Sequence, residues 1–165
     1  MLNSHAVDHA ETIGVTVAIT EIDKAYTAGL VDGEGWIGIQ CHRAGTKGSV
    51  NDDYAPAVSV TMADREPLDY MCNVWGGKIL LKKPHGTNKR AMYYMWYPRR
   101  AEMITLLEAI ESYLKIKAPQ ARLMLEYLSA RTNTVRASVK WQTPPEEIAL
   151  RRSYYEQSKA LNHRS

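Results

Sequence analysis

The chain has 165 residues, enough for one domain with a hydrophobic core and too few for two ordinary domains. Its 21 Lys and Arg outnumber its 18 Asp and Glu, giving a net charge of +3, and sixteen of the basic residues lie between residues 36 and 141. No uncharged stretch reaches the 18 residues of a membrane-spanning helix, and the early acids and histidines exclude a signal peptide, so we expect a soluble intracellular protein.

The cysteines and histidines predict neither a disulfide framework nor a zinc site. Cys41 and Cys72 are too few to cross-link a fold of this size and lie among apolar residues, so we expect two reduced packing residues. None of the five histidines combines with a Cys or another His at zinc-ligand spacing. The expected compartment is the cytoplasm of a prokaryote or an organelle, either a mitochondrion or a chloroplast.

The first predicted elements are a helix and a hairpin. Residues 20–23 resemble a capping box with Asp in the place of Glu, and apolar residues then recur at helical spacing as far as Val31. The segments 36–41 and 54–61 have the composition of strands, and a glycine-containing loop separates them. We therefore expect the helix to stop at Val31 and the two strands to pair.

The next predicted elements repeat this order. Asp64 can cap a second helix, which should end at Gly76 and Gly77. The segments 78–83 and 91–96 are typical of two more strands around a turn. Three further helices are expected, at about residues 99–113, from Pro119, and from Pro144 to about residue 161.

This order of elements predicts an α+β fold with a four-stranded antiparallel sheet at its centre. We expect a single domain over residues 1–165. Residues 1–19 would form an N-terminal extension, and residues 142–165 a C-terminal helical segment.

The segment from Tyr26 to Ile39, YTAGLVDGEGWIGI, breaks a rule of helix chemistry. Asp32 and Glu34 lie where the helix should end, although the carbonyl groups there disfavour an acid by up to about 1 kcal/mol. A simple helix cap and turn is one interpretation. A calcium loop is excluded, because its sixth position must be Gly and is Ile37. A phosphate-binding loop is excluded because these glycines follow a helix.

A second interpretation explains both the glycines and the acids. Ala28 and Gly29 are small residues inside the helix, where Gly costs about 1 kcal/mol unless a second backbone packs close by. Such packing would bring Glu34 near another acid. Carboxylates gathered at one point bind Mg²⁺, and two such ions can stabilise both the attacking and leaving oxygens of a phosphodiester.

Three motifs resemble those of one known family. Residues 27–35, TAGLVDGEG, resemble the signature of the LAGLIDADG homing endonucleases. Residues 75–79, WGGKI, resemble the family's turn into its third strand, and residues 113–121, YLKIKAPQA, resemble its L-x-x-K-x-x-Q-A segment. The three motifs occur in the family's order and cover about residues 20–130.

The resemblance implies a saddle-shaped sheet, with helices packed on one face, that lies in the DNA major groove, and it assigns site residues. Glu34 matches the metal-binding acid, and Gly33 the residue whose backbone carbonyl assists. Asp32 matches a structural position that closes the helix end. Lys117 matches the basic residue of the cleavage pocket, and Arg65 is a second basic candidate. Related enzymes often have a water-ordering polar residue where this chain has Met62 or Ala63.

The resemblance further implies a homodimer, because the chain has one signature. Its interface would include Ala28, Gly29 and Asp32; alternatively, Gly29 lies against the core of its own chain. The implied cofactor is Mg²⁺, as two or three ions shared across the dimer, while Ca²⁺ can bind without supporting cleavage. The implied activity is a double-strand break in a long pseudo-palindromic DNA site that leaves short 3′ overhangs and serves the mobility of an intron. An RNA-binding maturase acting on the host intron and a non-catalytic DNA-binding regulator remain alternatives.

The expected DNA surface follows the charge distribution. Between Lys78 and Arg100 there are seven basic residues and no acid, which favours phosphate contacts over a basic strand edge that serves only solubility. The candidate DNA contacts are Gln40, His42, Arg43, Lys47, Lys78, Lys82, Lys83, Asn88, Lys89 and Arg90. An alternative interpretation of Tyr93, Tyr94 and Trp96 is a base-stacking platform for single-stranded RNA, but we expect one alternating set of them to be core.

Overall fold

The computed structural model describes residues 18–45, 51–82, 93–131 and 143–163. Within these ranges, every helix is too short or too polar to cross a membrane. The elements in chain order are α1 (Glu21–Glu34), β1 (Gly35–His42), β2 (Asp53–Met62), α2 (Glu66–Trp75), β3 (Lys78–Lys82), β4 (Tyr93–Tyr97), α3 (Arg100–Ile110), the short 3₁₀ helix η2 (Glu111–Tyr113), α4 (Ala118–Ala130) and α5 (Pro145–Asn162).

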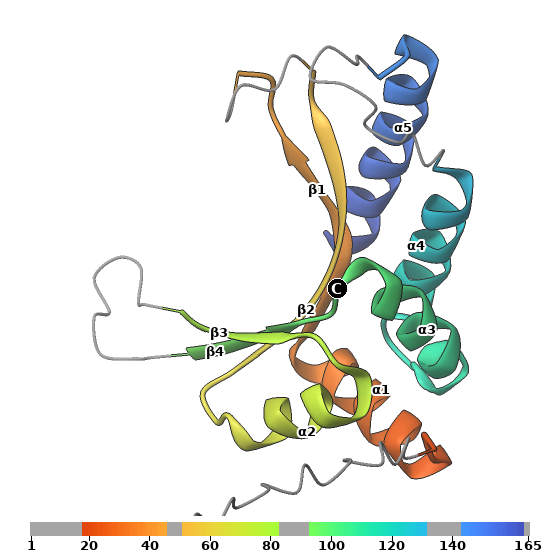
Figure 1. Ribbon diagram of the computed structural model, residues 1–165. Helices are drawn as coiled ribbons and strands as arrows, with labels where there is room; N and C mark the ends of the chain where they lie inside the picture. Colours follow the sequence, from red (N-terminus) through yellow and green to blue (C-terminus); the bar gives the residue numbers. More distant parts are fainter. Residues whose placement is uncertain (1–17, 46–50, 83–92, 132–142, 164–165) are drawn as a thin grey trace, which may run out of the picture.

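The four strands form one antiparallel sheet, as the sequence predicted, and their order in it is β1-β2-β4-β3. The hairpins β1-β2 and β3-β4 are paired along their described lengths, whereas β2 and β4 share only the register from Val60↔Trp96 to Met62↔Tyr94. The sheet bends at this short junction, and the helices lie on one side of it (Figure 1). The other side, which we call the open face, carries no described helix.

Residues that alternate along the strands form the core beneath the helices. Ile37 and Ile39 of β1 and Val58 and Val60 of β2 are buried on the helix side. The hydrophobic cluster continues into the inner faces of α1, α3 and α4. Cys41 and Cys72 are free, half-buried thiols beside this cluster, as predicted. Burial raises the pKa of the Cys72 thiol, as expected for a packing residue.

Helix α1 begins with the predicted capping box but does not end at the predicted residue. The side chains and backbone N–H groups of Thr20 and Asp23 bond reciprocally. The helix continues beyond Val31 to Glu34, and the N–H group of Gly35 donates to the carbonyl of Val31. The prediction of an end at Val31 is therefore wrong. An acid can stand in the last turn because the carboxylate of Asp32 accepts hydrogen bonds from another part of the chain, as described below.

The N-cap of helix α2 lies one residue later than the sequence predicted. Arg65 is the N-cap residue, and the Asp64 carboxylate accepts the N–H group of Glu66 at 3.1 Å. The helix ends at Gly76 as predicted. Gly76 and Gly77 have φ angles of +74° and +90°, a region that only glycine adopts easily.

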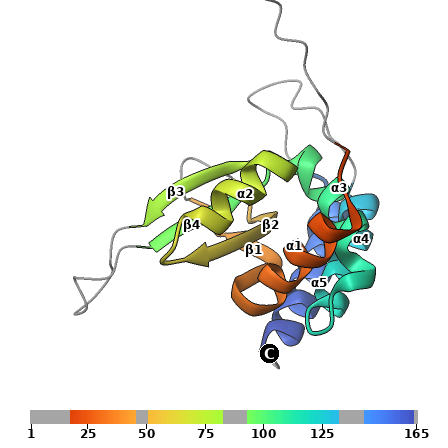
Figure 2. The same cartoon turned by 90° about the horizontal axis from the view of Figure 1, so that it is seen from below.

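Helices α1 and α2 lie side by side next to the sheet (Figure 2). The Trp75 indole donates to the hydroxyl of Thr27 at 2.8 Å, and the rings of Tyr26 and Tyr70 meet edge to face with centroids 5.1 Å apart. These contacts fix the position of α1 against its own chain.

Candidate active site

The end of α1 meets the segment that leads into α4 at Asp32. Its carboxylate accepts backbone N–H groups from Lys115 at 2.6 Å, Ile116 at 3.2 Å and Lys117 at 2.8 Å. These donors lie at the N-terminal side of α4, where a negative charge is favoured. Asp32 therefore joins two helices, and its charge is stabilised by α4 although it is disfavoured at the end of α1.

Lys117 is held at the same junction. Its ammonium group donates to the backbone carbonyl of Asp32 at 2.5 Å, and the side chain is half-buried. The cation is therefore fixed against the last turn of α1, directly before Gly33 and Glu34 in the chain. The structure thus brings Lys117 to the end of the helix that bears the predicted metal-binding acid.

Glu34 and Gly33 offer oxygen atoms of the kind that Mg²⁺ prefers. Both residues are exposed. The last hydrogen bond of α1 runs from the N–H group of Gly35 to the carbonyl of Val31, so the carbonyl of Gly33 comes after the last one that the helix itself uses. Among the described residues, no three or more His, Cys, Asp or Glu side chains are grouped so as to hold a metal ion. The donors fit a divalent cation, but a complete site requires further ligands besides those that these residues supply.

The exposed face of α1 is a stripe of four residues, Ile22, Tyr26, Gly29 and Gly33, which we call the α1 stripe. Ile22 is 79% exposed and Tyr26 45% exposed. A Cβ built on Gly29 or Gly33 would meet no atom within 4 Å, so the alternative that Gly29 packs on its own core is wrong. Tyr26 also touches Tyr70 of its own chain, so the stripe is partly covered there. An exposed stripe with two glycines is suited to close approach of another backbone.

Two of the predicted interface residues lie elsewhere. Ala28 is 1% exposed and belongs to the core of its own chain, so its assignment to an interface between chains is wrong. The reason is helical geometry, because Ala28 shares the inner face of α1 with Thr27 and Val31. The carboxylate of Asp32 is likewise bonded within its own chain, which agrees with the structural role predicted for it.

The open face of the sheet carries the predicted polar and basic residues that the structure describes. Gln40 and His42 are exposed on β1 and alternate with the buried Ile39. Lys78 and Lys82 are exposed on β3 and alternate with Ile79, which pairs with the fully buried Trp96. The four side chains therefore share the face that the helices leave uncovered.

Other predicted contacts are less well defined. Arg43 is exposed just beyond β1. The positions of Lys47, Lys83, Asn88, Lys89 and Arg90 lie outside the described residues.

Sequence reasoning missed the middle of the open face. There β2 presents Ala55, Ala57 and Ser59, which pair with Gln40, Gly38 and Trp36 of β1. Small residues at these positions keep the middle of the open face free of bulky side chains. The available signal was the alternation of these small residues with Tyr54, Val58 and Val60, which are buried.

Arg65 has partners on the helix side of the sheet. Its Nε lies 3.1 Å from the Asp69 carboxylate, and its guanidinium stands 5.9 Å from the centre of the Tyr94 ring. No contact within the described residues links it to Glu34 or Lys117, and its catalytic role stays a prediction. Met62 is half-buried and Ala63 exposed, so neither supplies a polar side chain there.

The three aromatic residues of β4 do not form one stacking platform. Trp96 is fully buried, and its indole donates to the carbonyl of Gly76 at 2.9 Å. Tyr94 is half-buried under Arg65, whereas Tyr93 is 42% exposed. One alternating set is therefore core, as expected.

No protein-family model and no curated protein sequence matches the chain. Solved structures do match. The homing endonuclease I-CvuI is similar with a TM-score of 0.65 and 19% identity, over 85% of this chain and 82% of that one. The archaeal intron-encoded homing endonuclease I-Vdi141I has a TM-score of 0.55 and 14% identity, over 84% and 98% of the two chains. The homing endonuclease I-TnaI has a TM-score of 0.56 and 17% identity, over 86% and 96%.

These likenesses, together with the sheet order and the position of α1, define the class of fold. The chain has the α+β fold of the LAGLIDADG homing endonucleases. The resemblance seen in the three sequence motifs is thereby confirmed for the fold.

Proposed function

We propose that this protein is a sequence-specific, divalent-metal-dependent DNA endonuclease that breaks both strands of a long site made of two related half-sites. The observation that carries the proposal is the junction at Asp32, which fixes Lys117 at the end of α1 beside the exposed Gly33 and Glu34. The similar proteins I-CvuI and I-Vdi141I were solved with DNA, and I-CvuI in the presence of Mg in one structure and Ca in another.

The open face would bind the duplex. Lys78 and Lys82 would neutralise backbone phosphates and release counterions, which makes binding strongly salt-dependent. Gln40 and His42 carry donors and acceptors that can read base edges in the major groove. Because these residues sit on a rigid sheet, their spacing along the strands would set the spacing of the contacts along the DNA.

The cleavage chemistry would take place at the end of α1. Glu34 and the carbonyl of Gly33 would hold Mg²⁺, which when bound supplies Lewis-acid stabilisation and a water of lowered pKa. The ammonium group of Lys117, held by the Asp32 carbonyl, would stabilise negative charge that develops on the phosphate. Asp32 would act as a positioning residue, because it fixes the backbone from which Lys117 projects.

A homodimer would complete the site. One chain supplies one Glu34, while cutting two strands requires two centres. Packing two α1 stripes together would bring the two helix ends, and with them both copies of Glu34, to the two-fold axis. A two-fold protein implies a two-fold DNA site. We further propose that the protein is encoded by an intron that it mobilises, as I-Vdi141I is described to be intron-encoded.

The test is a cleavage assay with Mg²⁺ on a duplex that spans the gene's own insertion site with the intron removed. The wild type should cut both strands and leave short 3′ overhangs. Glu34→Gln should abolish cutting and leave DNA affinity within about tenfold, or 1.4 kcal/mol, because Gln keeps the shape and loses the charged ligand.

The matched control is Glu21→Gln on the same helix. Glu21 lies in the first turn of α1, where it pairs with Lys24 at 2.6 Å, and its substitution should leave cutting unchanged. Cutting by Glu34→Gln at the wild-type rate would contradict the metal assignment. Specific binding by the wild type without cutting would instead support the regulator, and assistance to splicing of the intron RNA would reveal a maturase role.

A further inference from the structure

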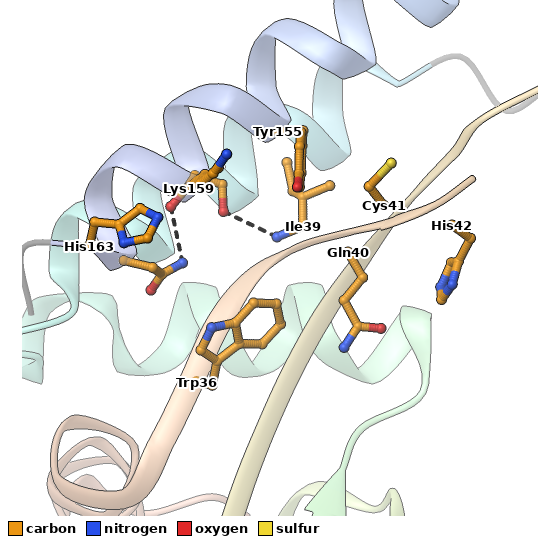
Figure 3. A pocket seen from close by; sticks show the side chains of 10 residues that line it. Trp36, Ile39, Gln40, Cys41, His42, Tyr155, Lys159 and His163 are labelled. Carbon is orange, nitrogen blue, oxygen red and sulfur yellow. Dashed lines mark hydrogen bonds between the residues drawn. The ribbon is translucent and has the colours of Figure 1, made fainter. Parts of the chain in front are cut away.

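A pocket of about 440 Å³ lies along the outer edge of β1, where α5 covers that strand. Trp36, Gln40 and His42 line it from β1, and Lys159 and His163 line it from the last turns of α5 (Figure 3). No Asp or Glu is among its described lining residues. The pocket therefore combines a lysine with imidazole and aromatic side chains, and it shares two residues with the open face.

Two side chains of α5 fix this helix against the strand edge. The N–H group of Ile39 donates to the hydroxyl of Ser158 at 3.1 Å, and the amide of Asn162 donates to the carbonyl of Ile37 at 3.0 Å. Ser158 and Asn162 lie one helical turn apart, so together they set both the position and the rotation of α5. They also cover backbone groups that an edge strand would otherwise expose.

Each of these anchoring residues is followed by a polar residue of the pocket. Lys159 follows Ser158, and His163 follows Asn162, so the anchors place both residues beside β1. The ammonium group of Lys159 takes part in no ion pair within the described residues. It is therefore available to an anion, and an imidazole such as that of His163 can donate a hydrogen bond to the same anion.

Side chains pack tightly around Gly38 at the floor of the pocket. The Trp36 ring lies flat over Gly38, where a Cβ would come within 2.5 Å of the ring carbon Cζ2. The amide of Asn162 would stand 2.9 Å from the same Cβ. Glycine at this position thus allows the indole and the end of α5 to meet over the strand.

We infer that this pocket binds a phosphate of the DNA backbone through Lys159 and His163. The inference rests on the proposed function, because a duplex on the open face must pass this edge of the sheet, where Gln40 and His42 belong to both surfaces. Since α5 is anchored at Ile37 and Ile39, the contact would lie on the part of the site nearer to Glu34. Helix α5 would then extend the DNA contact from the sheet to a helix.

The first test is the salt dependence of binding to the insertion-site duplex and to a duplex of unrelated sequence. Each phosphate contact contributes about 0.9 to the slope of log K against log salt. Lys159→Met should therefore lower the slope by about one and weaken binding to both duplexes by similar factors. Lys24→Met is the matched control, because Lys24 pairs with Glu21 on α1 and its loss should leave the slope unchanged.

A salt slope unchanged by Lys159→Met would assign this lysine a different role. A lysine near the C-terminal end of a helix also stabilises the helix by its interaction with the helix dipole. In that case Lys159→Met would lower the melting temperature and leave the salt slope at its wild-type value, which would overturn the inference. Cutting by the wild type would be unaffected by that outcome, so the proposed endonuclease would stand.

The second test replaces single phosphates of each half-site by neutral methylphosphonates. In the wild type, one such position near the centre of the site should weaken binding, and Lys159→Met should make that position insensitive. A scan in which the variant stays sensitive at every position would overturn the inference. A separate titration with inorganic phosphate tests whether the pocket binds a small anion instead. If phosphate shifts the NMR signals of the His163 imidazole while Lys159→Met leaves DNA binding unchanged, the pocket binds a small anion and the inferred DNA contact is wrong.

Discussion

At the scale of single residues, Asp32 resolves the conflict at the end of α1. An acid there is disfavoured by the helix to which it belongs, yet three backbone N–H groups ahead of α4 donate hydrogen bonds to its carboxylate. Hydrogen bonds to a charged group contribute about 1.5–3 kcal/mol each, which outweighs a dipole penalty of about 1 kcal/mol. The second acid, Glu34, gains no such support within the described residues, so stability does not explain its position, and the proposed metal-binding role would.

Asp32→Asn tests the structural part of this argument. The amide keeps the size of the side chain but loses its charge and turns an NH₂ group toward backbone donors. We expect the free energy of unfolding to fall by about 2–4 kcal/mol, because several charge-assisted bonds weaken together. Urea denaturation monitored by circular dichroism measures this change. A loss below about 0.5 kcal/mol would show that solvent replaces these bonds without cost.

Lys117→Met tests the chemical part. Methionine retains the apolar stem and removes the ammonium group that bonds to the Asp32 carbonyl. We expect single-turnover cleavage to slow by about 10²-fold or more, since charge developing on the phosphate loses its stabilising partner. Lys115→Met is the control, because Lys115 contributes only its backbone N–H group to Asp32. Equal rates for wild type and Lys117→Met would assign Lys117 a purely structural role.

At the scale of elements, a tyrosine connects helix α4 to the sheet. The Tyr127 hydroxyl donates to the carbonyl of Tyr54 at 2.5 Å, and both residues are buried. Burial raises the pKa of Tyr127 above its ordinary value. The unfolded chain therefore ionises this group at lower pH than the folded chain does, so its contribution to stability is complete below about pH 10 and is lost as the pH rises further.

Tyr127→Phe should show both consequences. The substitution leaves the buried carbonyl of Tyr54 without this donor, and we expect a loss of about 1–3 kcal/mol at neutral pH. The variant should also lose less stability than the wild type between about pH 9 and pH 11, because it lacks the group that ionises on unfolding. Chemical denaturation across this pH range measures both effects. Parallel pH profiles would show that Tyr127 does not contribute to alkaline unfolding.

At the scale of the whole molecule, two exposed surfaces of the described residues differ in character: the open face and the α1 stripe. The open face carries cations and hydrogen-bonding side chains, whereas the stripe carries apolar residues and two glycines with open space above them. We propose different partners for them, a charged duplex for the first and a second copy of the chain for the second. Glu34 is the last residue of α1, which carries the stripe, and β1, which carries part of the open face, begins at the next residue.

Gly29→Leu tests the proposed dimer. The isolated chain has room for the side chain, and leucine is a better helix former than glycine by up to about 1 kcal/mol, so the folded monomer should be no less stable. The dimer should nevertheless dissociate, because the side chain separates the two backbones, and cutting of both strands should be lost. Sedimentation with and without DNA measures the assembly.

Ala149→Leu is the control for Gly29→Leu, since it enlarges an exposed position on α5 away from the stripe. It should leave both assembly and cutting unchanged. A wild-type monomer that cuts both strands of an asymmetric site would overturn the proposed arrangement. A dimer that persists in Gly29→Leu would place the interface elsewhere.

The sequence by itself determined the order of elements, the pairing of both hairpins and the face on which Gln40, His42, Lys78 and Lys82 lie. These features depend on residues close together in the chain, such as the alternation around Ile39 or the glycines after Trp75. The three motifs also identified the fold and the site residues Glu34 and Lys117 as candidates. The assignment of their roles in catalysis stays a prediction.

Only the tertiary structure decided where α1 ends, which face of α1 holds Ala28, and how Lys117 is positioned. The partners of Asp32 are the backbone N–H groups of residues 115–117, which lie more than 80 residues away in the chain. Every residue except proline has a backbone N–H group, so the residue types at these positions do not reveal the partnership. The same holds for the anchoring of α5 on β1 by Ser158 and Asn162. A polar residue in a sequence shows that it needs a partner, but only the folded chain determines which partner it finds.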